Sequence, residues 1–390
     1  MSDAAATHKS THAGTMTRRN LFFIATFFAI LWLPLLDSFL HLDRTLPTNE
    51  NRALAPAPAA DAPKEFPRQF SAWYDDRFGF RNFLVKQYHT VHFGWLGITD
   101  PDLVVQGKED WLYLGRRRLI DEARGLNPAT EEDIATWVEK LDAIHAWQTQ
   151  RGGRFLLVLV PDKHRVYPEY LPDWFIPQEQ RRKEQLLQAL AVHEMEILDL
   201  TRILRIMKPA FSHDLWLKTD THWNGLGAFV ATQAITQQLG LPIPSEDDFV
   251  RANHPSLHED AWHKTGNLAD FLGVRGLVPE AWVGLVPNAP RAQFHTKFTP
   301  PTRNVSGVNV PLASRIENDT LPTGLVLGDS FRWALIPTLS ESFSEILYTD
   351  FRYCFFDPAF TESLDPDIIL FLMSERQLLR LPLPPSENTW

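Results

Sequence analysis

Apolar residues recur at helical spacing in three segments of the chain. The clearest segment begins at Thr130, which together with Asp133 resembles a capping box, and its apolar positions continue at steps of three and four residues until two glycines end it. A second segment covers 179–195. A third is capped by Asn224 and ends at Gly240. We expect a helix at each of these places.

Short uncharged runs of the kind that form buried strands lie among these helices. Four of them are expected to be strands: 155–160, 197–200, 324–328 and 368–373. This alternation predicts an α/β fold, a mainly parallel sheet flanked by helices, with function on the loops at the carboxyl edge of the sheet. The stretch 251–315, rich in Asn, Pro and His, is interpreted as an insertion whose structure the pattern does not define.

A longer apolar run lies near the start of the chain. Residues 21–36 carry no charge, and with the next four residues they reach about the twenty that a bilayer span requires. Arg18 and Arg19 precede the run, and a positive flank keeps the amino end in the cytoplasm. We therefore expect a cytoplasmic tail at 1–19 and an uncleaved transmembrane signal anchor at 20–41, with the body of the protein outside the cytoplasm. A cleaved signal, of the twin-arginine type or another, is the alternative.

Composition bounds what the body can be. The chain has 390 residues, of which 44% are hydrophobic and 22% charged, enough for a large globular core. Its net charge of −10 argues against nucleic-acid binding. Cys354 is the only cysteine, which excludes an intrachain disulfide and a cysteine-based zinc site.

The proline- and alanine-rich stretch 56–67 predicts a spacer. We place this spacer at 42–103, together with an N-terminal segment that packs on the body. The main domain is placed at 104–390.

Two motifs far apart in the chain carry residues suited to acyl transfer. Asp220 and His222 lie in TDTHWNG, and Ser330 follows Gly-Asp after the strand expected at 324–328. A serine hydroxyl is a weak nucleophile unless a neutral imidazole takes its proton, and a carboxylate holds that imidazole in the correct tautomer. In an extended segment, residues two apart face the same side, so Asp220 can reach one ring nitrogen of His222 while the other faces the serine. Each motif alone is common in turns, but together they predict a serine acyl-transfer site.

A metal site is the alternative interpretation of the acid and base. His213 and Asp214 could complete a zinc set with Asp220 and His222. The triad is favoured because a metal would make Ser330 unnecessary. We expect no metal and no cofactor, since no phosphate-cradling glycine loop is evident either.

The wording and order of these motifs resemble one family. DTHWN followed later by GDSF is similar to the SGNH-hydrolase-like alginate O-acetyltransferases, periplasmic proteins of polysaccharide O-acetylation. Further blocks agree, namely NENRALAP at 49–56, DDRFGFRN at 75–82, GKEDWLYLG at 107–115, PDKHRVYPEYLP at 161–172 and SER at 374–376. The resemblance covers roughly 49–376. It implies an SGNH-hydrolase-like fold with permuted motif order, because here the acid and base precede the nucleophile.

The resemblance also implies roles for residues and partners. The family's catalytic Ser, His and Asp fall on Ser330, His222 and Asp220. It implies an inner-membrane protein with one span and a periplasmic catalytic domain, supplied with acetyl groups by a membrane-bound O-acyltransferase. We expect the acetyl group to pass through an acetyl-serine onto hydroxyls of an exported polysaccharide. The alternatives are a carbohydrate acetylesterase with the same triad and a non-catalytic polysaccharide-binding scaffold.

Four further residues are candidates for the oxyanion hole or the substrate site. The N–H of Ser330 is a natural oxyanion donor, and Asn267 or Arg332 could supply the second. Tyr353 could point its phenol at the oxyanion, and Trp223 could stack on a sugar ring. For each of these four, a purely structural role is the alternative.

Overall fold

The computed structural model describes residues 18–45, 54–59, 63–96, 99, 102–115, 117–252, 266–272, 274, 278, 283–295, 312–351 and 356–379. The chain divides into two compact units, 1–91 and 92–390. The division expected from the sequence, with a boundary at 104, stays a prediction.

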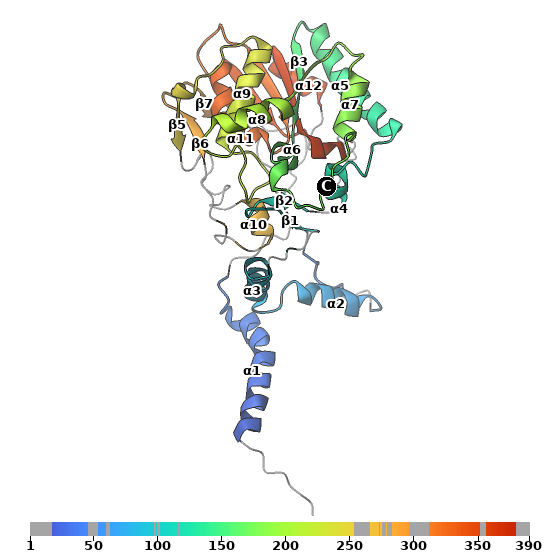
Figure 1. Ribbon diagram of the computed structural model, residues 1–390, viewed down its shortest axis with the longest axis vertical. Coiled ribbons are helices and arrows are strands. Elements are labelled where there is room, and N and C mark those ends of the chain that lie inside the picture. Colours follow the sequence, from blue (N-terminus) through green and yellow to red (C-terminus); the bar gives the residue numbers. More distant parts are fainter. Residues whose placement is uncertain are drawn as a thin grey trace, which may run out of the picture. The chain divides into compact units, whose positions relative to one another are not determined.

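The regular elements described in the first unit are helices. They are α1 (Arg18–Leu40), α2 (Phe66–Asp75) and the greater part of α3 (Arg81–Gly94) (Figure 1). The apolar run predicted near the start of the chain is α1, which is long and apolar enough to cross a membrane. Its last turns carry a buried Asp37, whose two carboxylate oxygens accept hydrogen bonds from the N–H of Asp43 at 2.6 Å and of Phe80 at 2.8 Å. This carboxylate therefore joins the end of α1 to the turn that precedes α3.

The second unit is built on a seven-stranded sheet with the order β4-β3-β11-β9-β10-β8-β7. The five strands from β4 to β10 run parallel, and β8 and β7 add an antiparallel edge. Their bounds are β3 (Arg154–Val160), β4 (Glu196–Asp199), β7 (Gln293–His295), β8 (Leu312–Arg315), β9 (Thr323–Gly328), β10 (Glu345–Thr349) and β11 (Ile368–Ser374). The predicted α/β fold with a mainly parallel sheet is confirmed.

Helices cover both faces of this sheet, which is why its central strands are apolar along their whole length. In β3, Leu156 and Val158 pack on the side of α8, α9 and α11, whereas Phe155 and Leu157 pack on the side of α5 and α7. The helices of the second unit that flank the sheet are α5 (Glu131–Gln150), α7 (Arg182–Leu190), α8 (Leu200–Met207), α9 (Gly225–Leu239), α11 (Arg332–Leu339) and α12 (Pro358–Leu364) (Figure 1).

The helix boundaries follow the capping residues. Thr130 and Asp133 form the predicted capping box of α5. The Asn224 side chain accepts hydrogen bonds from two N–H groups at the start of α9, and Gly240 ends that helix with a positive φ of 69°. The helix predicted at 179–195 is shorter, at 182–190, because the chain must leave it early to bring β4 into register beside β3.

Smaller elements surround the carboxyl edge of the sheet or lie against its flanking helices. They are the hairpin β1 (Val104–Gln106) with β2 (Leu112–Leu114), the pair β5 (Phe249–Ala252) with β6 (Gly284–Pro287), the helices α4 (Arg117–Ala123), α6 (Lys163–Val166) and α10 (Asn267–Phe271), and the 3-10 helices η1 (Pro168–Tyr170), η2 (Lys208–Ala210), η3 (Glu246–Asp248), η4 (Ser340–Ser342) and η5 (Glu375–Leu379). Within the described part of 251–315, β6 pairs with β5, and β7 and β8 extend the main sheet. Strands β3, β11 and β9 are neighbours and parallel, so the residues that follow them meet at one edge.

Candidate active site

Ser330 lies in a sharp turn between a buried strand and a helix. β9 ends at Gly328 and α11 begins at Arg332, so the serine is presented at the carboxyl edge of the sheet, as the sequence predicted. Its backbone N–H donates to no acceptor within the part of the chain that the structure describes. An N–H in this position suits a developing oxyanion on a carbonyl that the serine attacks.

The residue before the serine holds this turn in place. Asp329 is completely buried, and its Oδ1 accepts a hydrogen bond from the N–H of Phe331 at 3.0 Å. Its Oδ2 accepts two more from Ser374, one from the N–H at 2.9 Å and one from the hydroxyl at 2.6 Å. Ser374 is the last residue of β11, so the carboxylate fixes the nucleophile's turn to the neighbouring strand.

The acid and the base of the predicted triad form one hydrogen-bonded row with the serine. His222 Nδ1 lies 2.6 Å from Asp220 Oδ1, and His222 Nε2 lies 2.8 Å from the Oγ of Ser330. Because the carboxylate can only accept, Nδ1 carries the ring proton of the neutral imidazole, and Nε2 is left to accept the serine proton. The structure therefore brings the three residues together from two loops.

The backbone that carries the acid and base differs from the expected extended segment. Residues 218–222 form a turn and bends, and the Asp220 carboxylate accepts a hydrogen bond from the N–H of His222 at 2.9 Å. Such a side chain to main chain bond two residues on is typical of an Asx turn. The turn, rather than the alternation of a strand, places the carboxylate beside the ring.

Asn267 supports the acid instead of facing the serine. Its N–H donates to Asp220 Oδ2 at 2.8 Å, and its side-chain amide exchanges two hydrogen bonds of 3.0 Å with Thr221. Burial by itself raises the pKa of Asp220, but the charge and hydrogen bond of His222 and the N–H of Asn267 outweigh burial and hold that pKa below its usual value. The amide of Asn267 is thus committed to the acid loop, so we correct its predicted oxyanion role to a positioning role.

A buried lysine braces the chain just ahead of the acid. Lys163 Nζ donates to the carbonyl oxygens of Leu112 at 2.7 Å, Leu217 at 2.7 Å and Lys218 at 2.9 Å. These carbonyls belong to β2 and to the segment that leads into the Asp220 turn. A single ammonium group therefore connects the end of β3, the hairpin and the acid loop.

The other candidates of the sequence analysis have different outcomes. Arg332 is buried, and its Nη1 donates to the carbonyls of Gly328 and Asp329 and to Asp350 at 3.0 Å, so it braces the turn and is not placed as an oxyanion donor. The expectation that Trp223 stacks on a sugar is wrong. Only 2% of that residue is exposed, and its ring packs against Phe331. Tyr353 lies outside the described residues.

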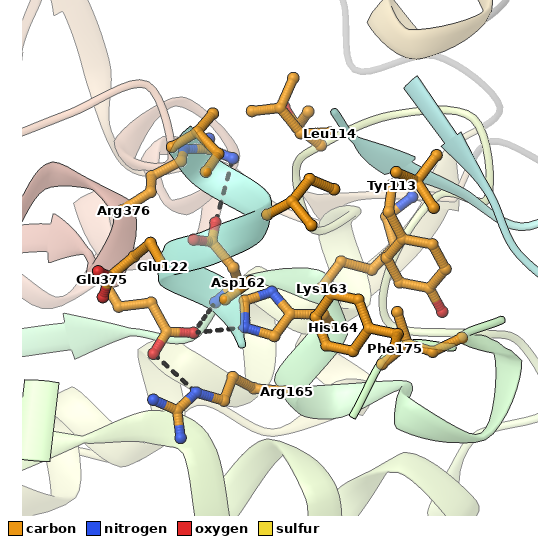
Figure 2. A pocket seen from close by; sticks show the side chains of 16 residues that line it. Tyr113, Leu114, Glu122, Asp162, Lys163, His164, Arg165, Phe175, Glu375 and Arg376 are labelled. Carbon is orange, nitrogen blue, oxygen red and sulfur yellow. Dashed lines mark hydrogen bonds and ion pairs between the residues drawn. The ribbon is translucent and has the colours of Figure 1, made fainter. Parts of the chain in front are cut away.

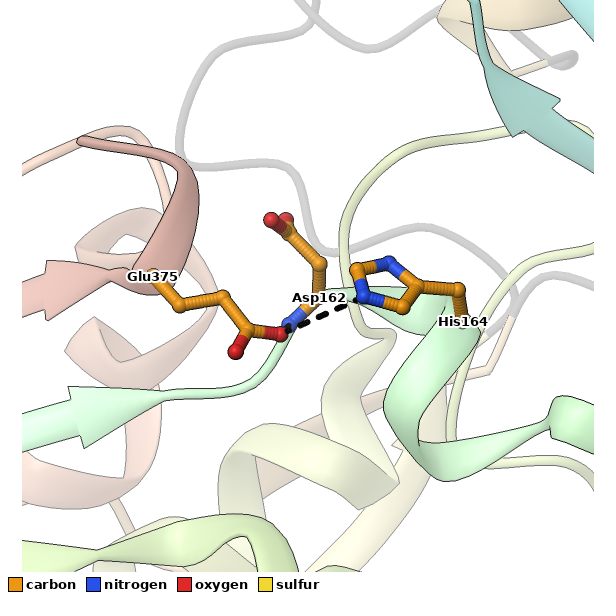
Figure 3. Close-up of side chains that lie close together, drawn as sticks. All are labelled: Asp162, His164 and Glu375. Atoms are coloured by element: carbon orange, nitrogen blue, oxygen red, sulfur yellow. Dashed lines mark hydrogen bonds and ion pairs between the residues drawn. The ribbon is translucent and has the colours of Figure 1, made fainter. Parts of the chain in front are cut away.

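The alternative zinc set is not assembled. Among the residues that the structure describes, the His and carboxylate ligand atoms that converge are those of Asp162, His164 and Glu375, which lie within 4.8 Å of one another (Figure 3). His213 is instead bonded to the neighbouring Ser212 at 3.0 Å. Asp220 and His222 therefore meet as a pair, without the two further ligands that the alternative required.

Each of the two carboxylates in this convergent cluster forms an ion pair with an arginine. Glu375 Oε2 lies 2.9 Å from Arg165 Nε, and Asp162 Oδ1 lies 3.1 Å from Arg376 Nη1 (Figure 2). Burial, reinforced by the charge of Arg165, holds the pKa of His164 well below its usual value. The same positive charges that keep the imidazole neutral also disfavour a metal cation there.

A cavity of about 50 Å³ lies beside the triad. Its wall includes Thr221, the residue between the acid and the base, together with the cluster of Asp162, His164 and Glu375 (Figure 2). The sequence analysis did not select Asp162, Glu375, Asp329 or Lys163 as candidates. They lie in the blocks PDKHRV, GDSF and SER on which the family resemblance rests, and their place after strands β3, β9 and β11 is the signal that could have identified them.

Comparison with known proteins agrees with this geometry. Residues 104–297 match the family described as "ALGX: SGNH hydrolase-like domain, acetyltransferase AlgX". The chain is 27% identical over 252 residues to the probable alginate O-acetylase AlgJ of Pseudomonas aeruginosa. The matched segment covers 62% of this chain and 59% of that protein. It is 26% identical over 176 residues to the probable alginate O-acetylase AlgJ of Pseudomonas syringae pv. tomato, covering 45% and 43%. The matched segments thus span less than two thirds of either relative.

Solved structures share the fold. A DHHW family protein from Eubacterium siraeum superposes with a TM-score of 0.50 at 16% identity, over 71% of this chain and 95% of that chain. PatB1 of Bacillus cereus gives a TM-score of 0.50 at 16% identity, over 71% and 97%. The sheet and its edge site define an SGNH-hydrolase-like α/β protein. Residues 104–297 are similar to the SGNH-hydrolase-like alginate O-acetyltransferase family, the family that the motifs indicated.

Proposed function

We propose that this protein is a polysaccharide O-acetyltransferase that carries the acetyl group on Ser330. The observation that carries the proposal is the row of two short contacts, 2.6 Å from Asp220 to His222 and 2.8 Å from His222 to Ser330. A neutral imidazole held by a buried carboxylate is what a serine needs to become a nucleophile near neutral pH. The relatives named as probable alginate O-acetylases support a polysaccharide as the acceptor.

The first half-reaction forms the acyl-enzyme. The Oγ of Ser330 attacks the carbonyl carbon of the acetyl donor while its proton passes to His222 Nε2. The oxyanion that develops is stabilised by the N–H of Ser330. The tetrahedral intermediate then collapses, the bond to the donor's leaving group breaks, and His222 returns its proton to that group. Asp220 stabilises the imidazolium that exists between these two proton transfers.

The second half-reaction releases the acetyl group onto a sugar. A hydroxyl of the polysaccharide attacks the ester carbonyl, and its proton passes to His222 Nε2 as the new carbon–oxygen bond forms. The bond to the Oγ of Ser330 breaks, and the serine recovers its proton from His222. No net proton or electron is consumed, because one ester is exchanged for another.

The arrangement of the chain supports a tethered enzyme. Helix α1, which begins with two arginines and is long and apolar enough to cross a membrane, is proposed as an inner-membrane anchor with the catalytic unit in the periplasm. Within this proposal, 1–19 is cytoplasmic, 42–103 links the anchor to the body and 104–390 carries the catalysis. A membrane-bound O-acyltransferase is the proposed acetyl source, since the catalytic unit then has no access to cytoplasmic acetyl donors.

The test uses a Ser330→Ala variant with Ser363→Ala as its matched control. Ser363 is exposed, and among the described residues its hydroxyl donates only to a carbonyl of its own helix. With an activated acetyl ester as donor and an oligosaccharide as acceptor, transfer should be lost in Ser330→Ala and retained in Ser363→Ala, both proteins being folded by circular dichroism. Normal transfer by folded Ser330→Ala would refute the proposal.

The same experiment separates transferase from esterase. An esterase uses the same triad and differs in that water attacks the acyl-enzyme. The ratio of acetylated oligosaccharide to free acetate, measured as the acceptor concentration rises, should increase toward transfer. If free acetate remains the main product at every acceptor concentration, the protein is a carbohydrate acetylesterase.

A further inference from the structure

The cavity is lined by residues that adjoin the two loops of the triad. Thr221, which lies between the acid and the base in sequence, forms part of its wall. Arg376 forms another part, and its guanidinium lies over the ring of Phe331, the residue after the nucleophile, at 5.0 Å from the ring centre. A group bound in this cavity is therefore next to both loops that carry the triad.

Two polar atoms in the cavity region have hydrogen-bonding capacity that the described protein residues leave unused. Asp162 Oδ1 and His164 Nε2 are buried, and neither has a hydrogen-bond partner among the residues described. Oδ1 lies 3.1 Å from Arg376 in an ion pair without hydrogen-bond geometry, and His164 Nε2 lies 3.7 Å from Glu375, beyond hydrogen-bond distance. A buried polar atom left without a partner is costly, so a ligand with hydroxyl groups gains by filling both positions.

Another part of the wall is apolar. It includes Val105, Leu114, Leu171 and Phe175, and the ring of Phe175 packs against the His164 imidazole with 5.9 Å between ring centres (Figure 2). A wall with an apolar side and a few placed polar atoms matches the edge of a sugar ring, which has C–H groups beside hydroxyls. A volume of about 50 Å³ holds on the order of three to five waters, the space that such an edge would displace.

Charge on the wall selects a neutral group. Lys163, Arg165 and Arg376 repel a cation, while the carboxyl groups of Glu122, Asp162 and Glu375 repel an anion. Burial raises the pKa of Asp162, and the nearby carboxyl of Glu375 opposes further negative charge. The imidazole of His164 is kept neutral, so its Nε2 can accept a hydrogen bond when Nδ1 carries the proton.

We propose that this cavity is the acceptor subsite of the transferase, in which the hydroxylated edge of a sugar residue donates to His164 Nε2 and Asp162 Oδ1 and accepts from Arg376. The proposal rests on the proposed acetyl transfer. One sugar residue held here by its uncharged edge lies against Thr221 and Arg376, next to the two triad loops, so the cavity selects which hydroxyl is directed toward the acetyl ester. His164 and Asp162 thereby become residues that determine acceptor specificity.

The test compares two substitutions at one position. His164→Phe keeps a ring but removes the polar atom, whereas Gln in His164→Gln retains a polar group near the position of Nε2. His193→Phe is the control, because His193 is a partly exposed histidine on a turn and does not line the cavity. The assay uses p-nitrophenyl acetate as donor. Its acceptor is cellohexaose or a mannuronate hexasaccharide, whichever the wild type acetylates faster. The acceptor KM should rise about tenfold in His164→Phe, as expected for one lost hydrogen bond.

Several outcomes decide the matter. The rise in KM should exceed any change in the rate of acyl-enzyme formation, and His164→Gln should recover most of it. An acceptor KM that is unchanged, or that changes by the same factor as acylation, would overturn the subsite.

Titration calorimetry of the Ser330→Ala protein with both hexasaccharides gives a readout that needs no acetyl transfer. Binding weakened by His164→Phe and not by His193→Phe supports the subsite even if wild type forms no acyl-enzyme, whereas no binding of either sugar at millimolar concentration contradicts it.

Discussion

Asp329 and Ser374 are joined by two hydrogen bonds to one carboxylate oxygen, 2.9 Å from the N–H and 2.6 Å from the hydroxyl of the serine. Asp329 belongs to the turn that carries Ser330, and Ser374 ends the adjacent strand β11. The position of the nucleophile is therefore set by the sheet itself. The aspartate of the Gly-Asp-Ser triplet has a structural task that its place in a turn motif does not reveal.

Asp329→Asn is expected to damage both stability and acylation. In the wild type three donors point at the Asp329 carboxylate, whereas the asparagine side chain replaces one of its oxygens with an NH₂ group that is itself a donor. At least one hydrogen bond to a buried charge is therefore lost, at about 1.5–3 kcal/mol. Thermal unfolding should show this loss, and acyl-enzyme formation should slow because Ser330 is displaced. The exposed Asp319→Asn serves as control. Equal melting temperatures for the two variants would contradict this role.

Lys163→Met is expected to loosen the acid loop. The change removes an ammonium that satisfies three backbone carbonyls, and the unfolding free energy should fall by about 2–4 kcal/mol. Because two of those carbonyls precede the Asp220 turn, the rate of acylation should fall as well. Lys140→Met on the exposed face of α5 gives the comparison. A folded Lys163→Met protein with unchanged stability and unchanged acylation would refute the bracing role.

Asp220 should make stability depend on pH in the acid range. Its pKa in the folded protein lies below the usual value, so its stabilising contribution is present above the unfolded pKa and is lost as pH falls through the folded pKa. Wild type should therefore be more stable than Asp220→Asn at pH 7, and the difference should shrink below about pH 4. Unfolding curves between pH 7 and pH 3 measure it. A difference that stays constant over this range would exclude the linkage.

Much of the fold could be predicted because its central strands are apolar on both faces. Runs such as 155–160 and 368–373 are recognisable without tertiary information, and Thr130, Asn224 and Gly240 mark helix ends by local chemistry. The antiparallel edge strands β7 and β8 carry no such signal. They are short, and Gln293–His295 is largely exposed, so their pairing depends on partners far away in sequence.

The triad was predictable in composition but its supporting contacts were not. Asp220, His222 and Ser330 lie in motifs, whereas the bonds of Asn267 to the acid loop depend on a long-range approach of α10. Trp223 illustrates the opposite case. An aromatic beside a catalytic base suggests a sugar platform, yet the hydrogen bond from its Nε1 to the carbonyl of Phe331 at 3.0 Å places it in the core. Burial is a property of the fold, which local sequence does not contain.

The anchor proposal predicts the topology of the chain. A periplasm-active phosphatase fused after Trp390 should be active, because the two arginines that begin α1 keep the amino end in the cytoplasm. Replacing Arg18 and Arg19 with Glu should reduce that activity by weakening the orientation signal. An inactive phosphatase together with an active cytoplasmic reporter at the same position would show that α1 is not inserted in this orientation.

The acetyl-serine is the central claim, and intact-protein and peptide mass spectrometry after brief exposure to p-nitrophenyl acetate tests it most directly. The account predicts one added acetyl group, located on Ser330, absent from Ser330→Ala and removed when an acceptor oligosaccharide is added. Slow deacylation without acceptor should allow the adduct to accumulate. Acetyl transfer that proceeds with no adduct on Ser330, or an adduct that forms equally in the Ser330→Ala protein, would contradict the account.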